Sequence, residues 1–222
     1  MGKYISEFRI LFNILFLMSI LSFSCNSQES KKVSDNKNEI IMETKKSEME
    51  IVNEYLLCKN FEIENEILFV SVENQKMYHI LGNQIKTEYI ISTSEYGVGS
   101  KAGSNKTPLG LHKVKEKFGD ETPENGRMIG RIFYGQIATI LSDTSRSETD
   151  DVTSRIFWLE GMEEKLNKGE KIDSYLRYIY IHGTSEEGRL GKPASHGCIR
   201  MKNKDVIDLY KIIEVGTLVL IL

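Results

Sequence analysis

The 222-residue sequence has little proline, little cysteine and no excess of basic residues. Three prolines rule out a proline-rich or collagen-like chain, and three cysteines are too few for a disulfide scaffold. The 29 Lys and Arg residues against 32 Asp and Glu residues give a net charge of -3, which disfavours nucleic-acid binding driven by bulk positive charge. Hydrophobic residues make up 40% of the sequence, enough for one ordinary globular core.

The first 24 residues have the pattern of an export signal. A basic start is followed by an apolar run, residues 10–21, which is shorter than the ~20 residues of a membrane-spanning helix and fits the central region of a secretory signal peptide. Ser24 and Cys25 then resemble a bacterial lipoprotein processing site. We expect residues 1–24 to be a lipoprotein-like signal peptide, Cys25 to be lipidated, and the protein to be exported to the cell envelope or periplasm with a membrane anchor. A plain signal peptide and an uncleaved anchor are the alternatives.

Charged residues dominate the segment that follows. Residues 26–50 contain five Lys, six acidic residues and no aromatic residue. Such a composition buries too little apolar surface to offset its chain entropy. We therefore predict that residues 25–60 form a flexible charged tether. A solvated helix is the alternative for Ile40 to Leu57, where apolar residues recur loosely.

Residues 65–222 predict a mostly β domain with a few short helices. Three runs rich in β-forming residues are separated by polar or Gly-Asn turn signals, which is the pattern of a β-meander. These runs are residues 67–72, 77–81 and 85–92. Further strands are expected at residues 110–117, 175–181 and 217–222.

Two of the C-terminal elements bear on the candidate site. In the predicted strand 175–181, side chains alternate between faces. One face would therefore carry Leu176, Tyr178, Tyr180 and His182. After this strand, Asn203 is expected to cap a helix that Gly216 ends.

The residues that suggest chemistry are concentrated between positions 181 and 201. His182 and Cys198 are 16 positions apart, and Ser195, His196 and Gly197 precede the cysteine directly. A thiol with a pKa of ~8.5 is a poor nucleophile at neutral pH until a base such as imidazole removes its proton. Gly197 lacks a Cβ, so the backbone N–H groups around it could approach a reacting carbonyl and hold an oxyanion. The segment thus predicts an acyl-transfer site.

The same segment resembles the L,D-transpeptidase (YkuD-type) catalytic domain family. The resemblance is carried by His182-Gly183-Thr184 and by the run from Ser195 to Met201, Ser-His-Gly-Cys-Ile-Arg-Met. Upstream similarity extends through residues 70–78, 107–110 and 155–161. The resemblance covers residues 65–222 and implies a mixed, β-sandwich or barrel-like catalytic domain.

By this resemblance, Cys198 attacks the diaminopimelate–D-Ala bond of a peptidoglycan tetrapeptide stem and forms a thioester. An amine acceptor, such as another stem, a D-amino acid or a wall-linked protein, then takes the acyl group, which would serve cell-wall cross-linking or remodelling. His182 is implied to be the general base and later the acid. The Gly183 carbonyl is implied to orient its ring.

The resemblance also implies roles for the neighbours of these residues. Ser195 and His196 shape the pocket around the thiolate, and the Gly197 backbone contributes to the oxyanion site. Arg200 and Tyr180 are candidates for substrate binding. For Arg200, holding a stem carboxylate and bracing the loop against an acidic neighbour have equal weight.

The same residues also allow less specific interpretations. Cys198 could be a buried core cysteine or pair with Cys58, although pairing would leave the thiol inactive. A zinc site of His182, His196 and Cys198 is disfavoured, because the sequence has no His-Glu-x-x-His helix and no second Cys pair. We expect neither a metal nor a cofactor. His79 and His112 fall in strand patterns and are expected to be structural.

Two loop regions and three function classes remain open. The glycine-rich residues 97–103 are expected to form a flexible loop near the site rather than a phosphate loop. Residues 119–174 fit a lid over the substrate or a plain surface insertion. An exported L,D-transpeptidase is the leading function. An L,D-carboxypeptidase or amidase on the same domain and a non-catalytic wall-binding module are the alternatives. The oligomeric state is not predicted.

Overall fold

Ten strands form a single sheet in this computed structural model, which describes residues 46–61 and 65–222. The strand order is β4-β10-β1-β2-β3-β9-β8-β7-β5-β6, and β4 pairs with β7 as well. The strands are β1 (Glu66–Ser71), β2 (Lys76–Leu81), β3 (Gln84–Ser92), β4 (Gly110–Phe118), β5 (Gly126–Ile129), β6 (Ile132–Ile137), β7 (Val152–Gly161), β8 (Tyr180–Thr184), β9 (Ile199–Met201) and β10 (Leu218–Ile221).

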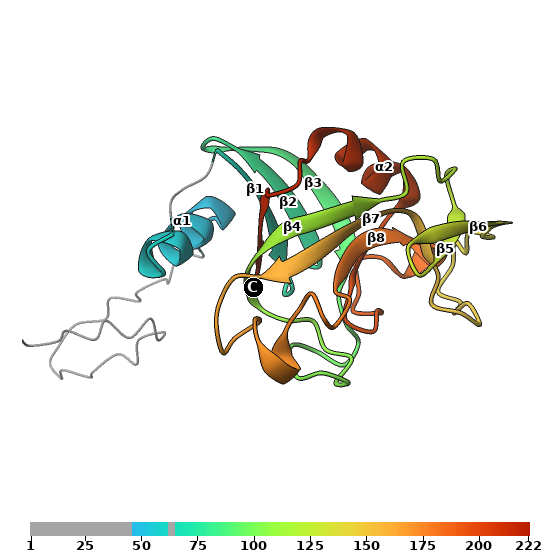
Figure 1. Cartoon of the computed structure of the whole chain (residues 1–222). Coiled ribbons are helices and arrows are strands. Elements are labelled where there is room, and N and C mark those ends of the chain that lie inside the picture. Colours follow the sequence, from blue (N-terminus) through green and yellow to red (C-terminus); the bar gives the residue numbers. More distant parts are fainter. Residues whose placement is uncertain (1–45, 62–64) are drawn as a thin grey trace, which may run out of the picture. The chain divides into compact units, whose positions relative to one another are not determined.

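The β4–β7 pairing closes eight of the ten strands into a ring. The remaining two, β5 and β6, form an antiparallel hairpin that continues the sheet from β7 and projects outward in Figure 1. The prediction of a mostly β, barrel-like domain with a few short helices is therefore confirmed. The three expected strands of the meander and the terminal strand are present with shifts of one residue at their ends.

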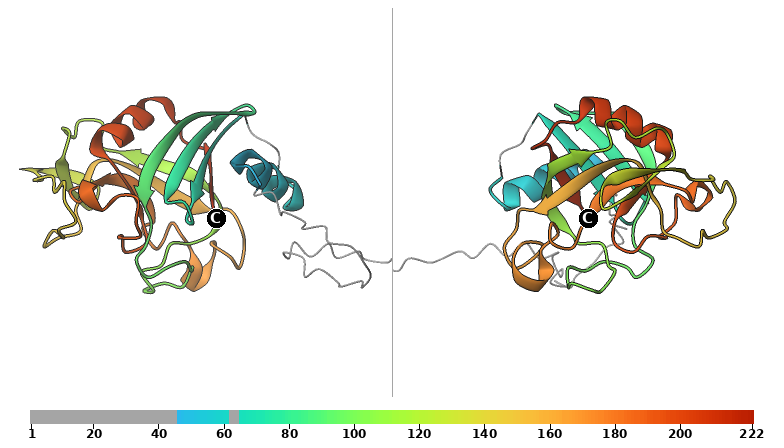
Figure 2. Two further views of the ribbon diagram at one scale, coloured as in Figure 1. Left: turned by 180° about the vertical axis from the view of Figure 1, so that it is seen from behind. Right: turned by 45° about the vertical axis from the view of Figure 1, so that its right-hand side comes forward.

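Alternation along the strands separates two apolar clusters. Leu68 and Val70 of β1 belong to a cluster that includes the C-terminal helix, whereas Ile67 and Phe69 belong to a second cluster that includes the N-terminal helix. Both faces of β1 are therefore covered, which explains why this strand is apolar almost throughout. Figure 2 shows the curved sheet of β1–β3 from two further sides.

The C-terminal helix α2 (Asn203–Ile212) packs Val206 and Leu209 into the first cluster, as its helical spacing predicts. The expected capping role of Asn203 is wrong: Lys202 occupies the cap position, and no side chain caps this end. The Asn203 side chain is buried and donates to the Thr184 carbonyl at 2.7 Å. It thereby connects α2 with the end of β8.

The N-terminal helix α1 (Glu48–Cys58) corrects the prediction of a flexible tether over this range. Ser47 and Glu50 form a capping box, and Val52 and Leu56 are buried against the outer face of the sheet. The helix is therefore neither a flexible segment nor a fully solvated one. The signal peptide, Cys25 and the tether as far as residue 45 lie outside the described residues. Within the described part of the chain, no helix combines the length and apolar character needed to cross a membrane.

Two further expectations for the second half of the domain are wrong. The predicted strand 175–181 begins only at Tyr180, because the chain turns before it and Tyr178 has a φ of 58°. Leu176 and Tyr178 consequently do not share a strand face with Tyr180. Residues 119–174 are neither a lid nor a surface insertion as a whole. They supply the projecting hairpin and β7, which lies between β8 and β4.

Candidate active site

The loop before β9 presents the cysteine in a tight, internally bonded turn. The Ser195 hydroxyl donates to the Cys198 carbonyl at 2.6 Å and accepts the Gly197 N–H at 3.2 Å. Gly197 has a φ of 126°, a conformation that L side chains rarely adopt, and its carbonyl accepts from Thr107 Oγ1 at 3.0 Å. The Gly197 N–H, which was expected to face an oxyanion, is thus engaged by Ser195 in this structure.

The parallel pairing of β8 with β9 brings the candidate residues together. His182 lies opposite Arg200 in the register, and Ile181 lies opposite Ile199. Because side chains alternate along a strand, Arg200 points to the same face as His182, and Cys198 directly precedes β9. The Tyr180 N–H donates to Cys198 Sγ at 3.3 Å, which fixes the start of this alignment.

Cys198 is a free, partly exposed thiol, so it does not pair with Cys58. Its S–H donates to the Tyr178 carbonyl at 3.4 Å. Burial of the sulfur raises the pKa of Cys198 to about 12, against the opposing effects of the Tyr180 N–H and of the Arg200 and Arg177 guanidinium groups. The thiol is therefore protonated at neutral pH.

His182 is buried and held by its neighbour. The residue is only 2% exposed, and its Nδ1 donates to the Gly183 carbonyl at 2.6 Å. Because a carbonyl only accepts, Nδ1 carries the proton and Nε2 is left as the basic nitrogen. Burial lowers the pKa of His182 to about 4, while the negative charge of Asp150 works in the opposite direction. The imidazole is thus neutral at rest.

A chain of ion pairs surrounds this neutral pair. The buried Arg200 guanidinium donates to Glu186 at 2.8 Å and to Asp150. Asp150 also accepts from Nδ1 of the partly exposed His196 at 2.7 Å. Arg200 therefore braces the loop against acidic neighbours and offers no accessible group to a stem carboxylate, which corrects its candidate role in substrate binding. Sequence reasoning missed both carboxylates, because no local pattern marks them.

Arg177 is a second cation near the thiol that sequence reasoning missed. Its guanidinium donates to the Gly99 carbonyl at 3.3 Å and to the Lys106 carbonyl at 2.6 Å. Both carbonyls belong to the loop region that contains the glycine-rich segment, which therefore lies beside the site. Positive charge at Arg177 lowers the pKa of Cys198, although burial outweighs it. Arg177 was missed because residues 175–181 were predicted to be a strand, whereas Arg177 lies in the turn before β8.

An aromatic cluster forms the wall next to the cysteine. Trp158 stacks on Tyr175 with centroids 4.0 Å apart and meets the Tyr180 ring edge-on at 5.7 Å. The Arg131 guanidinium lies 4.5 Å from the Trp158 ring centroid and donates to the Tyr180 hydroxyl at 3.2 Å. Trp158 and Tyr180 are buried. The hydroxyl of Tyr180, a candidate for substrate binding, is engaged by Arg131.

The other histidines are held by local hydrogen bonds. His112 is fully buried between the Gly110 carbonyl and the Ser174 hydroxyl, and His79 contacts Glu66 at 2.8 Å. These contacts fit the expected structural roles. Within residues 46–61 and 65–222, no group of three or more His, Cys, Asp or Glu side chains is arranged to hold a metal ion.

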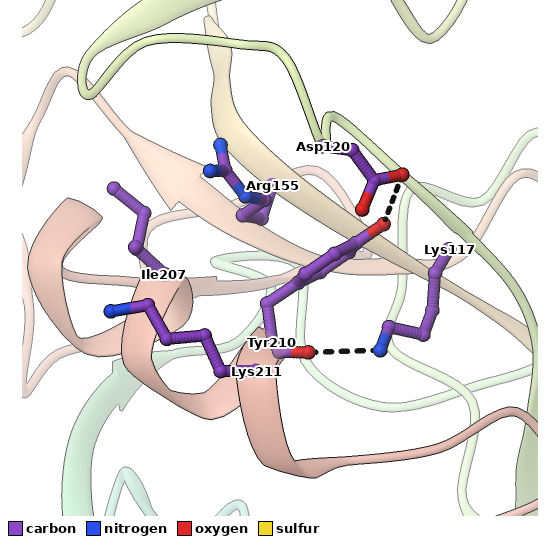
Figure 3. Close-up of a pocket in the computed structure, with 6 residues that line it drawn as sticks. All are labelled: Lys117, Asp120, Arg155, Ile207, Tyr210 and Lys211. Atoms are coloured by element: carbon purple, nitrogen blue, oxygen red, sulfur yellow. Dashed lines mark hydrogen bonds between the residues drawn. The ribbon is translucent and has the colours of Figure 1, made fainter.

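A separate surface pocket of about 410 Å³ lies along α2 and contains neither Cys198 nor His182. Figure 3 shows the Tyr210 ring at its centre, with the hydroxyl bonded to Asp120 at 3.2 Å and Lys117 bonded to the Tyr210 carbonyl at 2.8 Å. The pocket is lined by Lys117, Asp120, Arg155, Ile207, Tyr210 and Lys211. Arg155 and Lys211 also bond to residues outside the pocket. Its polar groups are thus already engaged, so it does not compete with the cysteine as the candidate site.

The fold and the site together define a mostly β domain with one cysteine–histidine centre. A protein-family model described as the L,D-transpeptidase catalytic domain (YkuD) matches residues 65–221. Because this match covers well over half of the sequence, the chain belongs to the YkuD L,D-transpeptidase catalytic domain family.

Similar proteins carry the same family name. Bacillus subtilis YqjB, named as an L,D-transpeptidase, is 56% identical over 45 residues, which are 20% of this chain and 26% of that protein. Bacillus subtilis YkuD, similarly named, is 56% identical over 41 residues, or 18% and 25% of the two chains. The matched segments thus span about a quarter of these relatives. A crystal structure of an L,D-transpeptidase from Xylanimonas cellulosilytica is 17% identical, with a TM-score of 0.45 over 72% of this chain and 62% of that one.

Proposed function

We propose that the chain is an exported peptidoglycan L,D-transpeptidase in which Cys198 carries the acyl group as a thioester. The observation that supports this most is the parallel pairing of β8 with β9, which sets the free thiol that precedes β9 next to the strand that carries His182, whose Nδ1 is held by the Gly183 carbonyl. This arrangement leaves Nε2 of His182 as the group that takes up and returns protons.

In the first half-reaction, the Cys198 sulfur attacks the carbonyl carbon of the diaminopimelate–D-Ala bond in a tetrapeptide stem. The S–H proton passes to Nε2 of His182 as the C–S bond forms. When the C–N bond breaks, His182 returns this proton to the departing D-Ala amine. A thioester and a neutral imidazole remain.

In the second half-reaction, an acceptor amine attacks the thioester carbonyl and gives a proton to His182. The C–S bond breaks, and the sulfur recovers the proton as the free thiol. Attack by water instead of an amine would release a tripeptide, so the same centre supports hydrolysis when no amine reaches it. The acceptor therefore decides between cross-linking and trimming.

The experiment is the incubation of the purified protein with a disaccharide-tetrapeptide muropeptide, followed by mass spectrometry of the products. We expect cross-linked dimers and released D-Ala from the wild type, and at least 1000-fold less product from Cys198→Ala, roughly the loss seen when a nucleophile is removed. Cys198→Ser is the matched variant, because its hydroxyl keeps a donor for the Tyr178 carbonyl.

Each outcome has a defined meaning. Tripeptide without dimers would replace the transferase proposal by an L,D-carboxypeptidase. Equal turnover by the wild type and Cys198→Ala would remove the cysteine from the mechanism. The absence of any product from the wild type with several amine acceptors would contradict the proposal as a whole.

Export and lipidation are part of this proposal, because a peptidoglycan substrate lies outside the cytoplasm. They are supported by the apolar run at residues 10–21 and by Ser24-Cys25. Metabolic labelling with palmitate should mark the protein in membrane fractions. We expect Cys25→Ala to lose the label and Cys58→Ala, the control, to keep it. Label that persists in Cys25→Ala would contradict lipidation at this cysteine.

A further inference from the structure

We propose that Asp150 is a positioning residue of this centre: its carboxylate, fixed by Arg200 and His196, stabilises the protonated form of His182, chiefly while the acceptor attacks the thioester. The inference rests on the proposed function, since it concerns a step of acyl transfer. It assigns a purpose to a carboxylate from the segment before β7, about 50 positions away from the cysteine loop that it contacts.

Hydrogen bonds hold the Asp150 carboxylate against Arg200 and His196, each of which is two positions from Cys198. One oxygen accepts from Arg200, which lies directly opposite His182 in the β8–β9 register. The other oxygen accepts from His196 Nδ1 at 2.7 Å. Arg200 is 2% exposed and cannot swing away, whereas Asp150 and His196 are 33% and 45% exposed and stand at the solvent side of the site.

The charges nearby do not cancel the effect of Asp150 on the imidazole. Glu186 binds Arg200 and is itself paired with Arg189 at 2.8 Å. The carboxylate of Asp150 raises the pKa of His182 more than the guanidinium of Arg200 lowers it. The charged and titratable groups that surround the pair are Glu95, Asp150, Arg177, Glu186, Arg189, His196 and Arg200.

The effect of the Asp150 carboxylate on the Cys198 thiol is unfavourable for catalysis, whereas its effect on His182 is favourable. Asp150 raises the pKa of Cys198, which disfavours the thiolate. During attack on the stem, a thiolate and an imidazolium form together, so the two effects of Asp150 oppose each other. During attack by the acceptor amine, His182 gains the positive charge and the balancing negative charge develops on the carbonyl oxygen, while the sulfur stays bound to the acyl carbon. The unfavourable effect of Asp150 on the thiolate is therefore absent from this attack, and its favourable effect on His182 remains.

The test compares wild type with Asp150→Asn in two measurements. The first is the alkylation rate of Cys198 by iodoacetamide, followed by mass spectrometry of its peptide. We expect alkylation to accelerate severalfold, because removing a negative charge lowers the pKa of the thiol. The second is turnover of tetrapeptide with an amine acceptor. We expect kcat to fall about tenfold, the equivalent of one pKa unit at His182, with the thioester accumulating.

A structural role alone would not produce changes of opposite sign. Asp150→Glu should recover part of the turnover, and the acidic limb of the kcat profile should move to lower pH in Asp150→Asn, because the pKa of His182 falls further. Asp143→Asn is the matched control, since Asp143 lies in the same segment, is exposed and bonds only to Ser145 nearby. Thermal unfolding of each variant checks that the fold is kept.

The outcomes separate this inference from the proposed function. Equal turnover and equal alkylation in wild type and Asp150→Asn would overturn the inference while leaving the function intact. A parallel fall of both rates, without thioester accumulation, would also overturn it. If the wild type itself turns over no stem peptide, the proposed function fails, and the assignment of Asp150 to acyl transfer fails with it.

Discussion

The two side chains at the centre of the site are held in their uncharged forms by the same physical cause. Desolvation raises the pKa of Cys198 to about 12 and lowers the pKa of His182 to about 4. A thiolate–imidazolium pair is therefore not the resting state. In the proposed mechanism, attack by Cys198 therefore requires a proton transfer that a bound carbonyl drives, and the protonated thiol should react slowly with reagents when no substrate is present.

Alkylation of Cys198 by iodoacetamide should therefore show no plateau near neutral pH. Because the pKa of the thiol is raised, the thiolate fraction and the alkylation rate should rise about tenfold per pH unit between pH 7 and pH 10. Rates are measured on the Cys198 peptide by mass spectrometry, which separates it from the other two cysteines. A rate that is already constant from pH 6 to pH 8 would show a preformed ion pair and contradict this expectation.

Sequence reasoning singled out Cys198, His182 and the Gly183 carbonyl, because they belong to two short segments whose pattern is visible in the sequence. It was not sufficient for Asp150, which reaches the site only through the pairing of β7, β8 and β9. Local reasoning could not choose between the two roles of Arg200 either. Its burial and its two carboxylate partners are properties of the folded chain.

Among the secondary-structure elements, β1 to β4 and β10 were predicted from their runs of β-forming residues, whereas α1 was not predicted from its composition. The helix is rich in charge, and only Val52 and Leu56, four positions apart, are fully buried. One narrow apolar stripe is a weak signal for a helix in the sequence. The stripe is buried in the fold because the outer face of the sheet is apolar and packs against it. The strand predicted at 175–181 was wrong because a strong local signal was misleading. The β-forming residues at its start lie in a turn, where the rings of Tyr175 and Tyr178 stack on Trp158.

Adjacent leucines of α1 provide a direct test of this packing. We expect Leu56→Ala to lower the free energy of unfolding by about 2–4 kcal/mol, because Leu56 is fully buried against the outer sheet face. Leu57→Ala is the control, since Leu57 is 64% exposed and its loss should cost less than about 0.5 kcal/mol. Urea unfolding measures both. Equal effects would mean that the helix does not dock on the sheet.

The stability of the domain as a whole should depend on two buried histidines. Burial lowers the pKa of both His112 and His182 from 6.5 to about 4. The unfolded chain then binds more protons than the folded one between these values, so the stabilising effect is complete above pH 6.5 and is lost as the pH falls to 4. Each histidine contributes at most about 3 kcal/mol to this loss.

Urea unfolding at several pH values between 7 and 4 checks this dependence. His112→Gln keeps groups that can bond to the Gly110 carbonyl and the Ser174 hydroxyl but does not titrate in this range. We expect it to remove about half of the histidine-linked pH dependence, since two sites of similar pKa share it. An unchanged dependence in His112→Gln would show that this histidine is not neutral in the folded protein.

The seam between β4 and β7 has a consequence for contact between copies of the protein. A closed ring of strands has no edge strand with unpaired backbone groups that another chain could extend, whereas an open sheet has two edge strands. In the part of the chain that the structure describes, the hairpin continues the sheet beyond the ring and ends at β6, where Ile132 and Ile137 are exposed. Strand-to-strand association of two molecules, if conditions drive it, would therefore begin at β6, and a lysine at Ile132 or Ile137 would be the place to block it.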